Sequence, residues 1–94
     1  MEGELVEMHA IVHGYVQGVG FRITTLRYAT KLNLTGTVKN LLDGTVEIFV
    51  QGSREHLEQL VGDLKEHPRL GEVKRVDMDY YKPKRAFSDF QVIY

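Results

Sequence analysis

The stretch Val12-His13-Gly14-Tyr15-Val16-Gln17-Gly18-Val19-Gly20-Phe21-Arg22 decides the fold of this chain. It places three glycines within seven residues, between an alternating apolar segment and a segment with helical periodicity. Glycines at this density let backbone N–H groups turn inward around an anion at the start of a helix. Arg22, on the first helical turn, can add a guanidinium that binds phosphate through two N–H groups. The sequence therefore predicts a strand, a glycine-rich loop and a helix.

A glycine-rich loop by itself is a weak signal, because a strand-to-helix turn that binds nothing also needs glycines. The stretch is not the P-loop of nucleotide-binding proteins, since no Gly-Lys-Ser or Gly-Lys-Thr follows it. Its glycine spacing also differs from the Gly-x-Gly-x-x-Gly motif of dinucleotide-binding folds. A phosphate-binding loop and a plain turn both stay open at this point.

Hydrophobic periodicity sets the limits of the two elements around the loop. Apolar side chains alternate with other residues from Val6 to Val12, which predicts a half-buried strand that ends before Gly14. From Phe21 to Leu32 the apolar residues follow a helical spacing, and this helix is expected to end near Asn33.

The middle of the chain predicts a hairpin followed by a second helix. Asp43-Gly44 separates predicted strands over residues 36–42 and 45–51, because glycine supplies the positive φ of a tight turn. Ser53 can cap a helix with a clear apolar face, and His67-Pro68 is expected to end it, since proline disfavours helical geometry at the preceding residue.

The C-terminal part predicts two more strands, over residues 73–80 and 87–94, separated by Lys82-Pro83-Lys84-Arg85. The element order is βαββαβ with an additional C-terminal edge strand. This order favours an α+β, ferredoxin-like sandwich, in which two helices pack on one face of a mainly antiparallel sheet.

Composition excludes several classes of protein. The 94 residues contain no Cys, which rules out disulfide scaffolds, thiolate metal sites and Cys nucleophiles. The 12 basic and 13 acidic residues give a net charge of -1, so the chain has no general basic field for nucleic acid. No segment resembles a signal peptide or a membrane span. Residues 1–94 are expected to form one cytoplasmic, monomeric domain that binds neither membranes nor nucleic acid.

The histidines and the basic residues near the C-terminus predict no further site. His9 and His13 lie about 13 Å apart on a strand at ~3.3 Å per residue, too far to share a metal ion, and are expected to face solvent. His56 and His67 lack an H-E-x-x-H spacing. Basic residues between 74 and 85 alternate with acidic ones, which favours a solvated surface over an RNA-binding one. We therefore expect no metal and no cofactor.

Residues 12–22 match the first signature of the acylphosphatase family at each of its specified positions. A second stretch, Gly36-Thr37-Val38-Lys39-Asn40 with Gly44, Val46 and Gly52, matches the other signature except at Thr37, where an aromatic residue is usual. The chain therefore resembles acylphosphatases from about Val6 to its final strand. His67-Pro68 also differs from the Gly-Pro that family members often have.

The resemblance implies a metal-independent hydrolysis of small acyl phosphates to a carboxylate and inorganic phosphate, with the same ferredoxin-like fold. It implies that Arg22 and Asn40 are catalytic, with Asn40 orienting the attacking water. The phosphate would be bound by backbone amides, and inorganic phosphate or sulfate would compete for them. The residues expected to supply these amides are Val16, Gln17, Gly18, Val19, Gly20 and Phe21.

Two alternatives accompany this prediction. The chain could be a non-catalytic, ferredoxin-like regulatory module that keeps the phosphate pocket, although a pure binder would not need Asn40 beside Arg22. Asn40 could also be a turn-initiating residue before Asp43-Gly44. Thr37 carries no reacting group, so we expect it to change packing or substrate preference near the second strand.

Overall fold

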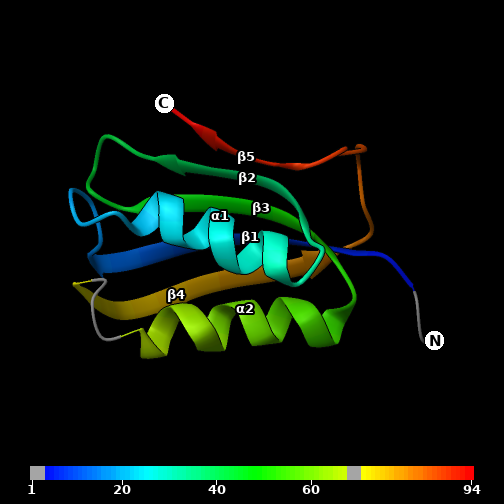
Figure 1. Ribbon diagram of the computed structural model, residues 1–94, viewed down its shortest axis with the longest axis horizontal. Helices are drawn as coiled ribbons and strands as arrows, with labels where there is room; N and C mark the ends of the chain where they lie inside the picture. The colour runs from blue at the N-terminus through cyan, green and yellow to red at the C-terminus, as the bar shows by residue number, and fades with distance from the viewer. Residues whose placement is uncertain (1–3, 68–70) are drawn as a thin grey trace.

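The computed structural model describes residues 4–67 and 71–94, and the chain folds as an α+β sandwich (Figure 1). The order of elements is the one that the sequence predicts. In chain order the elements are β1 (Val6–Tyr15), α1 (Phe21–Lys31), β2 (Thr35–Asn40), β3 (Val46–Gly52), α2 (Arg54–Glu66), β4 (Glu72–Tyr81) and β5 (Phe90–Ile93).

The strands form one sheet in the order β4-β1-β3-β2-β5. The pairs formed by β1, β2, β3 and β4 are antiparallel, whereas β5 pairs in parallel with β2 at the edge of the sheet. Both helices lie on the same face, with α1 against β2 and β5 and α2 against β3 and β4 (Figure 1). The predicted ferredoxin-like architecture and its additional C-terminal edge strand are confirmed.

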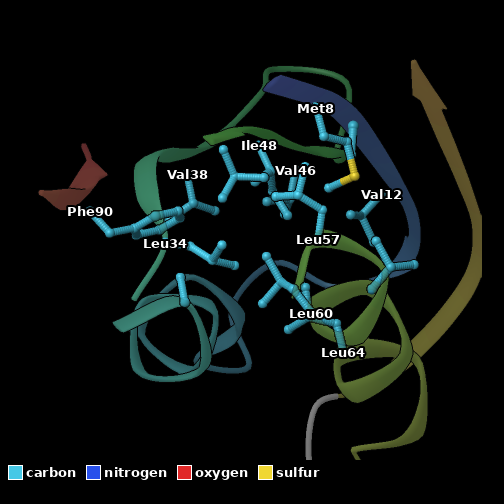
Figure 2. Close-up of a cluster of buried hydrophobic side chains, with 14 of the residues drawn as sticks. Met8, Val12, Leu34, Val38, Val46, Ile48, Leu57, Leu60, Leu64 and Phe90 are labelled. Atoms are coloured by element: carbon cyan, nitrogen blue, oxygen red, sulfur yellow. The ribbon is translucent and has the colours of Figure 1, made fainter. Parts of the chain in front are cut away.

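The hydrophobic core fills the layer between the sheet and the helices (Figure 2). Alternate residues of β1 and β3 point into it, and α2 contributes the apolar face predicted from its spacing. Ser53 caps α2, because its hydroxyl accepts a hydrogen bond from the His56 amide at 3.2 Å. Buried core residues include Met8, Val12, Leu34, Val38, Val46, Ile48, Leu57, Leu60, Leu64 and Phe90.

Some boundaries differ from the sequence-based ones. β1 continues through Gly14 to Tyr15, because the chain stays paired with β4 beyond an irregularity between His13 and Gly14. Gly14 has a φ of +134°, and a Cβ there would clash with the Glu72 carbonyl. This glycine therefore belongs to the strand rather than to the loop.

Two strands are shorter than expected. β2 ends at Asn40, so residues 41 and 42 belong to the turn, and β5 begins only at Phe90. The end of α2 agrees with the prediction, because the helix ends at Glu66 and His67 has an extended backbone as its C-cap. Pro68, which the sequence places at this boundary, lies outside the described residues.

The face of the sheet away from the helices buries a carboxylate. Glu7 is 0% exposed, although its place in the β1 alternation puts it on the polar face. Gln51 donates to Glu7 Oε1 at 2.8 Å and the Tyr81 hydroxyl donates to Oε2 at 2.9 Å, while Arg85 Nη2 lies 3.6 Å from Oε2. Arg85 also stacks over the ring of Phe49, at 4.5 Å from its centroid. The segment between β4 and β5 thus covers this end of the open face.

This arrangement predicts acid sensitivity. Burial by itself would raise the pKa of Glu7, but hydrogen bonds from Gln51, Tyr81 and the Lys84 backbone and the charge of Arg85 hold that pKa below its ordinary value. A lowered pKa contributes stability above the unfolded-state value of about 4.3, and this contribution is lost as the pH falls through the folded-state value. We expect Glu7→Gln to reduce the free energy of unfolding by about 1–3 kcal/mol at neutral pH and to flatten its acid dependence.

Denaturant unfolding at several pH values measures this effect. Glu58→Gln is the matched control, because Glu58 has a 60% exposed side chain and pairs with Arg54 on the surface of α2. Its effect should stay below about 1 kcal/mol. An unchanged acid dependence in Glu7→Gln would contradict the role of this carboxylate.

Candidate active site

A pocket of about 90 Å³ lies where the N-terminus of α1 meets the ends of β2 and β5. Three parts of the chain that are distant in sequence form it: the loop after β1, the last residue of β2 and the residue after β5. Its lining consists of Val16, Gly18, Gly20, Phe21, Arg22, Ile23, Asn40 and Tyr94.

The loop between β1 and α1 lines this pocket with Val16, Gly18 and Gly20. Gly18 and Gly20 have φ values of +77° and +80°, in the left-handed region that glycine adopts readily. Gly20 is the N-cap of α1 and supplies no side-chain cap, and the first turn contains no acidic residue. The first amides of a helix have no partners within the helix and lie at the positive end of its dipole. This local structure suits an anion.

Arg22 is held at the pocket by β5 and the residue after it. Its Nη1 donates to the Ile93 carbonyl at 3.3 Å, and its Cζ lies 4.8 Å from the centroid of the Tyr94 ring. These contacts leave the guanidinium with further N–H groups, since an arginine carries five donors. The parallel pairing of β5 with β2 therefore determines where the Arg22 side chain is anchored.

Asn40 brings an amide side chain to the same pocket. It is the last residue of β2 and is paired with Val46 of β3. Its Oδ1 is buried and has no hydrogen-bond partner among the described residues. A buried acceptor that lacks a partner costs about 1–3 kcal/mol, so it is uncommon unless a ligand or water serves it.

The structure brings most of the predicted site residues together. Arg22 and Asn40 line one pocket with four of the six predicted loop residues, whereas Gln17 and Val19 do not line it. The side chain of Gln17 instead reaches the turn between β2 and β3, and Val19 packs against the core.

Ile23 and Tyr94 are the lining residues that the sequence did not indicate. Ile23 follows Arg22 directly on the first turn of α1, where i and i+1 side chains point in different directions, so helical spacing did not suggest it. No local signal indicates Tyr94, because its place beside Arg22 depends on the pairing of β5.

The histidines of β1 each have an acidic partner instead of simply facing solvent. His9 Nε2 lies 2.8 Å from Glu47 Oε2, and its ring stacks on Phe49 with centroids 4.4 Å apart. His13 Nε2 lies 2.9 Å from Asp77 Oδ2.

Residues 4–67 and 71–94 contain no group of three or more His, Cys, Asp or Glu side chains placed to hold a metal ion. Nor does this part of the chain contain a helix long and apolar enough to cross a membrane.

Thr37, the departure from the family signature, lies away from the pocket. It pairs with Phe49 of β3, on the face of the sheet opposite to the helices, whereas Asn40 lies three residues further on β2. Since successive strand residues alternate between faces, the two side chains point to opposite sides. The substitution therefore affects the packing of the open face.

Comparisons with known proteins agree on one family. The acylphosphatase family model matches residues 8–92. An acylphosphatase of Caldivirga maquilingensis is 42% identical over 93 residues, which cover 98% of each chain. One from Thermococcus kodakarensis is 41% identical over 88 residues, 94% of this chain and 96% of that protein. The crystal structure of the Bacillus subtilis acylphosphatase superposes with a TM-score of 0.90 at 32% identity, over 95% of this chain and 99% of that chain.

The fold and the pocket define a small α+β sandwich protein with a pocket at a helix N-terminus that contains an arginine and an asparagine. The matches over nearly the full sequence make the assignment specific. The chain belongs to the acylphosphatase family and is an acylphosphatase, an enzyme that acts on small acyl phosphates.

Proposed function

We propose that this pocket is the active site, in which the amides of residues 16–21 and Arg22 hold the phosphoryl group and Asn40 orients the attacking water. The buried, unpartnered Oδ1 of Asn40, in the same pocket as Arg22, carries the proposal. A water that donates a hydrogen bond to this oxygen removes the cost of the unpartnered acceptor. The Asn40 side chain therefore favours a water molecule in the pocket that would hold the phosphate.

The chemistry needs few protein groups. Water attacks the phosphorus, and the bond between phosphorus and the acyl oxygen breaks to release a carboxylate. Because a carboxylate is a weak base, it leaves without a general acid. The proton of the water passes to a phosphoryl oxygen of the substrate. The atoms balance as one carboxylate and one inorganic phosphate.

The protein supplies positive charge and orientation. Loop amides, the N-terminus of α1 and Arg22 stabilise the charge on the equatorial oxygens of the transferred group. Asn40 can bind water through its donor and its acceptor without repelling phosphate, which a carboxylate at this position would do. Positioning and electrostatic stabilisation are the main requirements of phosphoryl transfer.

We also propose that residues 1–94 form a single domain that is monomeric and cytoplasmic. The single sheet and its one core, to which all seven elements contribute or against which they pack, support the first part. Light scattering and cell fractionation test the other two.

We expect the purified protein to hydrolyse benzoyl phosphate well above the spontaneous rate and to keep this activity in EDTA. The amides and Arg22 provide the positive charge that a metal ion supplies in other phosphatases. Release of phosphate with and without protein and chelator is the measurement. Complete loss of activity in EDTA would contradict the metal-free mechanism. Phosphate binding without turnover of any acyl phosphate would instead favour a non-catalytic regulatory module.

Arg22→Ala should abolish both turnover and the competitive inhibition by inorganic phosphate and sulfate, because it removes the guanidinium from the pocket. Arg22→Lys should also be strongly impaired, since an ammonium cannot hold two phosphoryl oxygens at once. Isothermal titration with phosphate measures the binding. Lys31→Ala, at the far end of α1, is the control. Normal phosphate affinity in Arg22→Ala would show that the guanidinium is not the ligand.

Asn40→Ala should separate binding from chemistry. If Asn40 orients water, kcat should fall by about a hundredfold while the inhibition constant of phosphate changes little. Steady-state kinetics and a melting curve on the same sample measure both. An early-melting variant with normal kcat would restrict Asn40 to shaping the turn and leave Arg22 and the loop amides as the whole site.

A further inference from the structure

The side chain of Gln17 connects two parts of the active site that the sheet keeps apart. The loop that holds Gln17 follows β1, whereas Asn40 ends β2, and β3 lies between these two strands. Gln17 Nε2 donates to the Leu41 carbonyl and to the Thr45 carbonyl, at 2.8 Å in both cases. Both N–H groups of the Gln17 amide are therefore used on the turn that follows Asn40.

The turn that accepts these bonds is held together by hydrogen bonds among its own residues. The Leu41 amide donates to the Thr45 carbonyl at 2.9 Å, and the Gly44 amide donates to the Leu41 carbonyl at 3.2 Å. Asp43 Oδ1 accepts from the amide and the hydroxyl of Thr45, at 3.0 and 2.6 Å. Each carbonyl bonded by Gln17 thus already accepts one backbone hydrogen bond, and Gln17 uses its second lone pair. A displacement of the loop relative to this turn would break two bonds at once.

We propose that Gln17 is a positioning residue, whose side chain fixes the distance between the phosphate-binding loop and Asn40. The inference rests on the proposed function, because the distance matters only if the loop holds phosphorus and Asn40 holds the water. Gln17 does not line the pocket, so it acts through its neighbours rather than on the substrate. A displacement of about 1 Å between nucleophile and target can cost about a hundredfold in rate.

The proposed positioning role belongs to the side chain of Gln17 and not to its backbone amide. The loop geometry and the N-terminus of α1 account only for an amide N–H at this position, which any residue except proline can supply. They do not account for a carboxamide with both donors on the neighbouring turn. Glutamate at this position cannot donate when ionised, and its charge would face two carbonyl oxygens. Methionine has a similar length and no donor.

The test compares Gln17→Met and Asn40→Ala, alone and combined, with benzoyl phosphate as substrate and inorganic phosphate as inhibitor. We expect Gln17→Met to lower kcat by at least about tenfold, with the phosphate inhibition constant within about threefold of the parent value. In the Asn40→Ala background, Gln17→Met should cause little further loss, because the water it helps to place is no longer oriented. Gln59→Met is the matched control, since Gln59 Nε2 bonds Asp63 at 2.9 Å on the exposed face of α2.

The pH dependence of Gln17→Glu gives a second readout that a purely structural role would not produce. Once protonated, the carboxyl can donate one hydrogen bond to the turn, which restores half of the connection. The ratio of kcat in Gln17→Glu to kcat in Gln17→Met should therefore rise as the pH falls from about 7 to about 4, through the ordinary pKa of a glutamate of about 4.3. If Gln17→Met does not fold, the kcat of Gln17→Glu relative to that of the parent protein is measured over the same pH range instead, with the same expected rise.

Three results would overturn the role of Gln17 and leave that of Asn40 in place. The first is a kcat in folded Gln17→Met within about threefold of the parent, and the second is a loss of phosphate affinity as large as the loss of kcat. The third is a flat ratio between the two Gln17 variants over the pH range. Normal turnover in Asn40→Ala alone would overturn the proposed role of Asn40 and, with it, that of Gln17. A failure of the proposed function would thus be seen in Asn40→Ala, whereas a failure of the Gln17 proposal alone would be seen only in the Gln17 variants.

Discussion

The burial of Phe21 connects the proposed active-site pocket to the core of the protein. Phe21 is the first residue of α1 and is only 1% exposed, and it also lines the pocket. Burying an aromatic side chain of this size stabilises the fold by about 1.5–3 kcal/mol. The burial of Phe21, which holds α1 against the sheet, therefore also fixes the N-terminus of α1. It fixes with it the loop amides that precede Phe21 and the Arg22 side chain that follows it. A loop held only by its glycines would lack this anchor.

The two faces of the sheet carry different kinds of side chain and contribute to different parts of the protein. The face toward the helices carries the apolar core and, at the end of β2, Asn40. The open face carries the histidine and carboxylate pairs of β1 and the buried Glu7 beneath Arg85. Thr37 lies on this second face, so a departure from the family signature can occur there without a change in the pocket. Because successive side chains of a strand point to opposite faces, the pocket and the ion pairs of the open face stay separate.

In the proposed mechanism the site uses positioned groups rather than reactive ones. Its side chains are a guanidinium bonded to the β5 backbone, an amide at the end of β2 and a carboxamide bridge to the turn. None of them needs an altered pKa, because the leaving carboxylate takes no proton in the transition state. Accuracy of placement then determines the rate, and placement across separate strands requires the sheet register and the bonds that connect its loops.

The sequence by itself determined the order of elements, the apolar faces of β1 and α2, and the pairing of a glycine-rich loop with Arg22. These features depend on local periodicity and on residues close together in the chain, so they can be seen without a structure. The second signature located Asn40 as well, through its resemblance to a known family rather than through any local pattern.

Only the tertiary structure decided that Glu7 is buried, that Gly14 belongs to a strand, that Tyr94 stands beside Arg22 and that Gln17 reaches across to the turn. Each of these contacts joins residues that are distant in sequence or depends on which strands are neighbours. Alternation along one strand shows which side chains share a face, but it does not show what covers that face. The parallel addition of β5 to β2 and the position of Arg85 are set by the packing of the whole sheet. The first completes the pocket, and the second covers one end of the open face.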